Sequence, residues 1–147
     1  MPNTAIRGLA LLHRIDQGLW LPAVLERWSG TIFRFSLSLI FIVGGLGHFF
    51  QLEEMLERIG ESPWRDEVAL LGDPAVLLWL SGGVFVLFGL LLMSGLLQRL
   101  SAIVLFITLV PITLSIHFAP GHVGPLLKNV VILGALLLVY TIGSEQR

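Results

Sequence analysis

The sequence predicts an all-α integral membrane protein: a four-helix bundle with an N-terminal amphipathic interfacial helix and an acidic outer loop. The first observation is composition, because 55% of the 147 residues are hydrophobic and only 13% are charged, whereas soluble domains average about a quarter charged. The second is the presence of four long apolar runs. The third is a short polar hairpin, residues 117–129, between the last two runs.

Each apolar run has about the length that a bilayer-spanning helix needs, ~20 residues. The runs cover residues 31–50, 74–97, 100–118 and 125–142. The second run has a clear start, since Asp73 can cap free N–H groups and Pro74 suits the first helical position. The third contains Pro111 in its middle, which removes a backbone donor.

Small residues indicate where these helices pack, because they let membrane helices approach closely. Gly82 and Gly89 lie seven residues apart in the second run. In the first run, five residues recur at spacings of three and four and therefore share one face. They are Arg34, Ser38, Phe41, Gly45 and His48. We expect this small and polar face to point into the bundle.

Residues 1–30 form a separate amphipathic segment ahead of the membrane domain of residues 31–147. Its apolar patch at 9–12 is too short for a signal peptide, and charged residues follow directly. Pro22 is expected to start a second short helix. The segment is predicted to lie in the membrane interface; packing against a partner subunit explains the pattern equally well.

Residues 51–73 form an acidic connection that holds seven of the ten acids. An apolar stripe predicts a surface helix over 51–59, ended by Gly60, and the acids are expected to form a solvated face. Six arginines fall with the termini and the middle turn, against three basic residues on the other side. The positive-inside rule therefore predicts cytoplasmic termini in the cytoplasmic (inner) membrane, with the acidic loop and the hairpin facing outward.

Several functions are excluded at this stage. A net charge of −1 and a pI near 6.4 argue against a nucleic-acid partner. The chain has no cysteine, which removes disulfides, thiolate catalysis and cysteine-ligated metals. No Ser/His/Asp triad, phosphate loop or pair of carboxylates within a span supports acyl, phosphoryl or glycosyl transfer.

Polar residues at one depth are the strongest indication of a site, because ionisable groups in membrane spans are costly. His48 ends the first run, His117 ends the third, and Lys128 and Asn129 lie near the start of the fourth. His48 and His117 fit proton or quinone chemistry, or ligation of a haem b. The two histidines could equally form interhelical hydrogen bonds with no further role. We interpret Asn129 as a residue that forms such an interhelical hydrogen bond. No other metal site is predicted.

Lys128 raises a question of its own. If Pro125 is the first helical residue, Lys128 lies in the first turn, at the positive end of the helix dipole. A cation there calls for a nearby anion or acceptor. That group is a bound oxyanion or quinone carbonyl, or it is Glu53 or Glu54 in an ion pair that holds the acidic loop in place.

The order of these elements resembles the DoxX family of small four-helix membrane proteins of bacteria and archaea. The resemblance rests on the segments Gly44-Gly-Leu-Gly-His48, Ser81-Gly-Gly, Gln98-Arg99 and Lys128-Asn129, and it covers residues 32–142. It implies a subunit of a membrane redox system, in one branch thiosulfate:quinone oxidoreductase, in others a complex that handles oxidative or sulfur stress. Thiosulfate is an anion, which Lys128 would suit.

Together these observations predict a membrane subunit of a quinone-linked redox assembly, with an outward-facing polar pocket lined by His48, His117, Lys128 and Asn129. Its partners would be the lipid bilayer and either a protein subunit or further copies of the chain. The alternative is a non-catalytic scaffold subunit of a larger membrane complex, whose polar groups only hold the loop in place.

Overall fold

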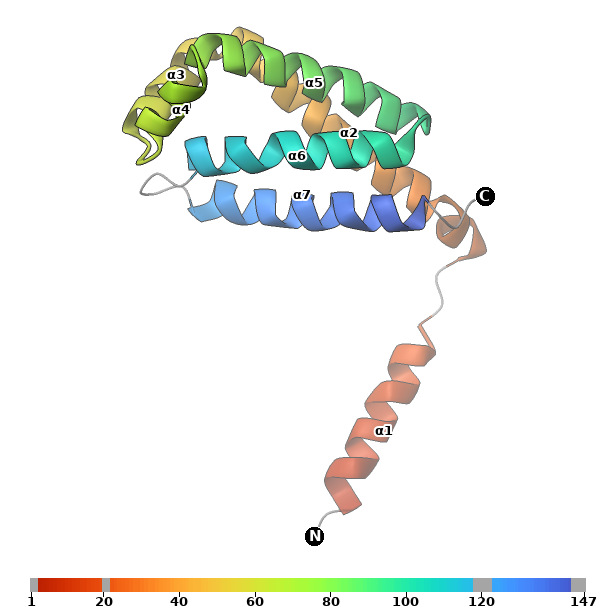
Figure 1. Ribbon diagram of the computed structural model, residues 1–147. Helices are drawn as coiled ribbons and strands as arrows, with labels where there is room; N and C mark the ends of the chain where they lie inside the picture. Colours follow the sequence, from red (N-terminus) through yellow and green to blue (C-terminus); the bar gives the residue numbers. More distant parts are fainter. Residues whose placement is uncertain (1–2, 20–21, 118–122, 144–147) are drawn as a thin grey trace. The chain divides into compact units, whose positions relative to one another are not determined.

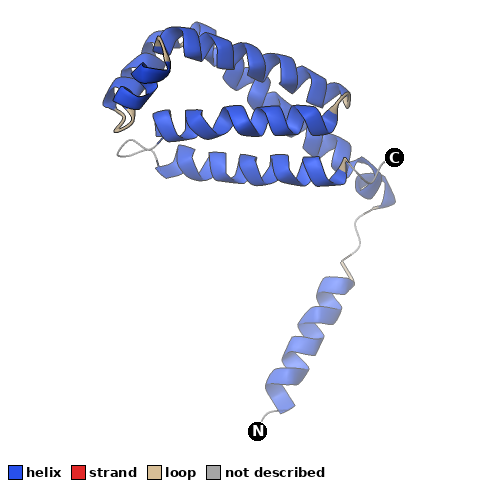
Figure 2. Cartoon of the chain, viewed as in Figure 1, coloured by secondary structure: helices blue, strands red, loops and turns tan. Residues whose placement is uncertain are grey.

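The computed structural model of the protein describes residues 3–19, 22–117 and 123–143, and every regular element in this part is a helix (Figure 2). The side chains of residues 3–7, 116 and 117 lie outside the description. The helices, in chain order, are α1 (Asn3–Gln17), α2 (Ala23–Phe50), α3 (Leu52–Glu61), α4 (Arg65–Leu71), α5 (Pro74–Ser94), α6 (Gln98–His117) and α7 (Val123–Ile142). The chain divides into two compact units, Met1–Ile32 and Phe33–Arg147.

The first unit holds α1 and the beginning of α2. Helix α1 is amphipathic, and the apolar side chains of Leu9, Leu12 and Ile15 are more than half exposed. The predicted short helix after Pro22, separate from the first span, is wrong, because α2 runs without a break from Ala23 to Phe50. Pro22 lies just before the first residue of α2, so it does not interrupt the helix. Gly30 lies inside α2, where a glycine destabilises a helix by only about 1 kcal/mol relative to alanine.

The second unit is a helical bundle in which α5, α6 and α7 lie side by side (Figure 1). One continuous apolar core joins them to α2. The rings of Phe41 on α2 and Phe85 on α5 pack edge to face, with centroids 5.2 Å apart. Leu92, Leu105 and Leu136 bring α5, α6 and α7 into the same core, each at most 1% exposed.

Glycines let α2 and α5 cross at very short range. A Cβ built on Gly45 would lie 2.7 Å from the carbonyl oxygen of Gly82, and a Cβ on Gly82 would lie 2.8 Å from the Cβ of His48. Gly89 faces α2 in the same way, with 2.9 Å from such a Cβ to Ile42. The predicted packing faces are therefore confirmed, including the buried Ser38, Phe41, Gly45 and His48 of α2.

The start of α5 follows the sequence prediction. Asp73 is the N-cap, and its Oδ1 accepts hydrogen bonds from the N–H groups of Ala75 (2.8 Å) and Val76 (3.4 Å), with Pro74 at the first helical position. The end of α5 comes three residues earlier than the predicted residue 97. Gly95 adopts a left-handed conformation, φ +81°, which is the usual way for glycine to end a helix.

The acidic connection contains two helices, whereas the sequence predicted one over 51–59. Helix α3 continues through Gly60 to Glu61, and α4 was not predicted. The apolar stripe of α3 faces the bundle: Ile59 is 6% exposed and packs with Leu78 of α5, and the partly buried Leu52, Met55 and Leu56 pack against this pair. This contact places α3 against the end of the bundle where α5 begins (Figure 1).

Four of the described helices are long and apolar enough to cross a membrane. They span Ala23–Phe50, Pro74–Ser94, Gln98–Ser115 and Val123–Ile142. The assignment of these four membrane spans rests on helix length and composition. It agrees with the four apolar runs predicted from the sequence.

Candidate functional site

A cavity of about 200 Å³ lies at the α3 end of the bundle, between α2, α3, α5, α6 and α7. Three of the four predicted site residues, His48, Lys128 and Asn129, line it. They come from the end of α2 and the first part of α7. The fold therefore brings together polar side chains that are far apart in the sequence.

His48 is 4% exposed and is held by one of its two ring nitrogens. Nδ1 lies 3.0 Å from the carbonyl oxygen of Leu78 and 2.9 Å from Ser81 Oγ, both on α5. Ser81 Oγ donates its own hydrogen to the same carbonyl, at 2.9 Å. Because a carbonyl oxygen only accepts, Nδ1 carries the proton. When the ring is neutral, Nε2 is therefore unprotonated and can only accept a hydrogen bond. It has no hydrogen bond to any described residue.

Asn129 is also 4% exposed and is held from one side. Its Nδ2 donates to Thr113 Oγ1 of α6 at 3.0 Å, and Thr113 donates onward to the Leu109 carbonyl at 2.7 Å. The predicted interhelical hydrogen bond is present. The amide oxygen Oδ1 has no partner among the described residues, so it remains available to the cavity.

Lys128 lies on the rim of the cavity with an exposed side chain. It is the sixth residue of α7, which begins at Val123. The prediction that it lies in the first turn is wrong, and the helix dipole acts weakly there because the effect is confined to that turn. Within the described residues, no ion pair joins Lys128 to Glu53 or Glu54.

Arg58 of α3 also lines the cavity, which the sequence did not predict. Its guanidinium forms an ion pair with Glu54, one helical turn earlier. Met55, three residues before Arg58, lines the same cavity. This spacing of three was the available signal, since residues i and i+3 of a helix share a face.

His117, the fourth predicted residue, is the last residue of α6, and its side chain lies outside the described part. The bis-histidine haem b therefore stays a prediction, for which His48 would offer Nε2. Among the described residues no group of three or more His, Asp or Glu is placed to hold a metal ion.

The remaining lining of the cavity is apolar and partly aromatic. Phe41 and Phe85 form one wall, and the imidazole of His48 lies beside Phe85 with ring centroids 5.5 Å apart. Leu109, Ile112 and Ile132 line the cavity from α6 and α7. The cavity thus combines an apolar, partly aromatic lining with a few hydrogen-bonding side chains at fixed positions, which is the usual composition of a small-molecule site.

A model of the DoxX family matches residues 30–118. The chain belongs to the DoxX family. No curated protein and no solved structure matches it. DoxX is a membrane family, and the four long apolar helices therefore make this DoxX protein a multi-pass membrane protein in contact with the lipid bilayer.

The family match covers part of the cavity. It includes His48 and Arg58 and ends at residue 118, before α7. Lys128 and Asn129 lie outside the match, so the resemblance predicted for residues 119–142 stays a prediction. In this DoxX chain α7 supplies two polar groups to a cavity whose other polar groups lie within the matched region.

Proposed function

We propose that this DoxX protein is the quinone-binding membrane subunit of a redox assembly, and that the cavity beside His48 takes the quinone headgroup. One observation carries the proposal. Three polar groups with unused hydrogen-bonding capacity, on His48, Lys128 and Asn129, share a single cavity with the rings of Phe41 and Phe85.

The chemistry of the cavity suits both redox states of a quinone. A quinone is a flat apolar ring with carbonyl oxygens that accept hydrogen bonds, and the ammonium of Lys128 can donate to one of them. The reduced quinol carries hydroxyl groups, which donate. His48 Nε2 and Asn129 Oδ1 are acceptors, so each can receive a hydrogen bond from quinol. The phenylalanine rings offer apolar faces against which the quinone ring can pack.

The electrons would come from elsewhere in the assembly. The chain has no cysteine to ligate an iron–sulfur cluster. We therefore include in the proposal a partner subunit that acts on a sulfur compound or serves in oxidative stress. The arrangement would lie in the cytoplasmic membrane of a bacterium or archaeon, with both termini inside and the cavity facing outward.

A scaffold role is the second candidate, and one observation favours it. Both buried polar side chains of the cavity already bond across helices: His48 joins α2 to α5, and Asn129 joins α7 to α6. A scaffold needs these bonds only to hold its helices together. It would bind no quinone and would copurify from native membranes with a larger catalytic partner.

Titration of the detergent-purified protein with a tail-less benzoquinone tests the proposal. We expect the wild type to bind both this quinone and its quinol saturably. Lys128→Ala should weaken quinone binding, His48→Ala should weaken quinol binding, and Leu127→Ala should change neither, because Leu127 is 59% exposed and lies outside the cavity lining. Equal affinity in all four proteins would remove His48 and Lys128 from the site. No binding by the wild type would leave the scaffold as the better account.

A further inference from the structure

The end of the bundle where α5 ends and α6 begins holds a half-buried cation without a partner. Nε of Arg34, on α2, is shielded from solvent and forms no hydrogen bond to any described residue. No carboxylate in the described part of the chain forms an ion pair with Arg34. A buried hydrogen-bonding group without a partner is costly, and a charged one more so. A ligand that supplies acceptors to this guanidinium would remove the cost.

A second donor lies beside Arg34, at the turn between α5 and α6. A Cβ built on Gly95 would lie 3.4 Å from Nη2 of Arg34 and 3.5 Å from Nε2 of Gln98, so both donors reach the same small region. Gln98 is half-buried, and its side chain forms no hydrogen bond to a described residue. It is also the first residue of α6, and the first N–H groups of a helix have no acceptor within that helix.

Arg99 brings a second guanidinium to this end of the bundle. A Cβ built on Gly143, just after α7, would lie 3.1 Å from Cγ of Arg99 and 3.6 Å from Oε1 of Gln98. The side chain of Gln98 therefore reaches from Arg34 toward Arg99. Residues 74–144 contain no Asp or Glu, so α5, α6 and α7 supply no carboxylate that could balance the two charges.

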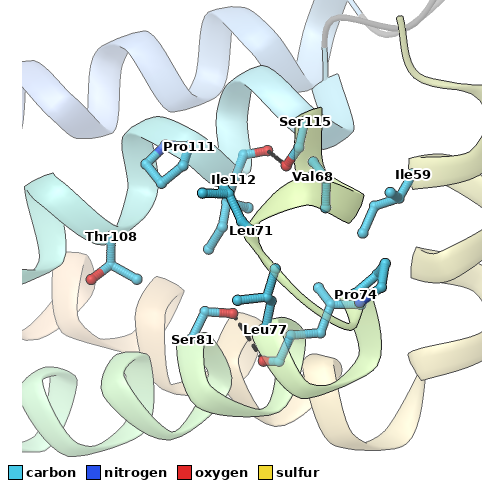
Figure 3. Close-up of a pocket in the computed structure, with 11 residues that line it drawn as sticks. Ile59, Val68, Leu71, Pro74, Leu77, Ser81, Thr108, Pro111, Ile112 and Ser115 are labelled. Carbon is cyan, nitrogen blue, oxygen red and sulfur yellow. Dashed lines mark hydrogen bonds between the residues drawn. The ribbon is translucent and has the colours of Figure 1, made fainter. Parts of the chain in front are cut away.

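The hydroxyl of Ser101 has no partner either. The hydroxyls of Ser81 and Ser115, which line an apolar cavity between α3, α4, α5 and α6, donate to carbonyls of their own helices at 2.9 Å and 3.3 Å (Figure 3). Ser101 differs, because it is 0% exposed and its Oγ has no hydrogen bond to a described residue. It lies three residues after Gln98, on the same face of α6. Polar side chains at this end thus have unused hydrogen-bonding capacity.

An apolar groove of about 340 Å³ lies between α6 and α7 and begins at the same end of the bundle. Ala102 and Tyr140 line the part of the groove nearest to Arg99, whose Cζ lies 4.6 Å from the centroid of the Tyr140 ring. Ile107 and Leu137 line the groove farther along and are 64% and 54% exposed. The groove is therefore open to the surrounding lipid, with a cation at one end.

We propose that Arg34, Gln98 and Arg99 bind the phosphate of an anionic phospholipid, and that an acyl chain of this lipid lies in the groove between α6 and α7. Arginine binds phosphate oxygens through charge-assisted hydrogen bonds. The ends of membrane-spanning helices lie at the depth of the lipid headgroups, so the available phosphate is that of a lipid. The lipid is anionic, because the ammonium of a zwitterionic headgroup would meet two guanidinium groups and no carboxylate.

This inference does not depend on the proposed function. Arg34 precedes His48 by fourteen residues on α2, which is about 21 Å along a helix. The phospholipid site and the cavity beside His48 therefore lie at different depths in the membrane, and each can be tested without the other.

Native mass spectrometry of the detergent-purified protein tests the headgroup. The probes are phosphatidylglycerol and phosphatidylcholine with identical acyl chains. We expect the wild type to bind phosphatidylglycerol about tenfold more tightly, the effect of one hydrogen bond to a charged group. Arg34→Gln and Arg99→Gln should each remove most of this preference. Arg65→Gln is the matched control and should keep it, since Arg65 pairs with Asp66 outside this cluster. Equal affinity of the wild type for the two lipids, or an equal loss in Arg65→Gln, would overturn the inference.

Inorganic phosphate separates a lipid site from a site for a free anion. We expect millimolar phosphate to leave phosphatidylglycerol bound to the wild type, because the acyl chain in the groove adds to the affinity. Displacement of phosphatidylglycerol by millimolar phosphate would identify a free-anion site and overturn the assignment to a lipid.

Photolabelling of the wild-type protein locates the acyl chain. The probe is phosphatidylglycerol with a diazirine in one acyl chain, and labelled positions are read by peptide mass spectrometry. We expect labels on Phe106 and Leu137 of the groove, which excess phosphatidylglycerol removes and excess phosphatidylcholine does not. Labels spread evenly over exposed residues such as Leu80 and Leu138, or displaced equally by both lipids, would overturn the inference. If an arginine variant does not fold, these wild-type measurements decide.

Discussion

His48 and Gly82 face each other across the α2–α5 crossing so closely that a Cβ on residue 82 would lie 2.8 Å from the Cβ of His48. Real Cβ atoms essentially never approach so closely. His48 therefore keeps its position beside Leu78 and Ser81 only because residue 82 has no side chain. Helix packing and the candidate site depend on the same glycine.

Gly82→Ala should force α2 and α5 apart and destabilise the protein by about 1–3 kcal/mol, the usual cost of overpacking. The added methyl would also meet the Gly45 carbonyl oxygen at 2.9 Å. Gly83→Ala is the control, because nothing lies within 4 Å of a Cβ there. Thermal unfolding in detergent measures both. Equal stability of the two variants would contradict the close crossing.

His48→Asn should separate the structural role of His48 from its role in binding. An asparagine amide nitrogen can take the place of Nδ1 and donate to the Leu78 carbonyl, while nothing replaces Nε2. We expect near-normal thermal stability with a loss of up to about tenfold in quinol affinity, the effect of one hydrogen bond to a ligand group. His48→Ala should lose both thermal stability and quinol affinity. Normal quinol binding by His48→Asn would show that Nε2 does not contact the ligand.

The Asn129–Thr113 hydrogen bond should give a measurable coupling energy. A double-mutant cycle with Asn129→Leu and Thr113→Val isolates it, because each change removes one partner of the 3.0 Å bond. We expect about 0.6 kcal/mol, the mean for interhelical hydrogen bonds in membranes. The cycle is read from unfolding in detergent, and strict additivity of the two changes would show that the bond contributes nothing.

Arg58 should favour negatively charged ligands of the cavity. The probe is a hydroxynaphthoquinone that is an anion at neutral pH. Arg58→Ala should lower its affinity roughly threefold, a size in keeping with a partly exposed charge, and salt should reduce the difference. Arg65→Ala is the matched control, since Arg65 pairs with Asp66 and lies outside the cavity lining. Equal effects of the two changes would indicate a general surface-charge effect.

Much of the helix packing could be predicted from the sequence because it is local or periodic. Gly82 and Gly89 repeat at helical spacing, and the Asp73–Pro74 pair has one simple structural explanation. The buried face of α2 follows from the same periodicity. For the site, the expectation of a similar depth was enough to group His48 with Lys128 and Asn129, and all three line one cavity.

Two features could not be predicted from the sequence. One depends on tertiary contacts, and the other on a residue type that fits several positions of a helix. Pro125 did not mark the start of α7, because the N–H groups of a first helical turn have no intrahelical acceptor and proline is accepted anywhere in it. Lys128 therefore lies farther into the helix than predicted. Arg58 was missed because a pair with Glu54 at i, i+4 is indistinguishable in sequence from a solvated surface pair.

Lys128 is the sole lysine of the chain, which allows a direct test of the central claim that a quinone headgroup occupies this cavity. Acetylation with an amine-reactive ester modifies only Lys128 and the N-terminal amine, and the N-terminal amine serves as the internal control. We predict that saturating tail-less quinone slows acetylation of Lys128 several-fold and leaves the N-terminal rate unchanged, read by peptide mass spectrometry. Equal acetylation rates of Lys128 with and without quinone would contradict the account.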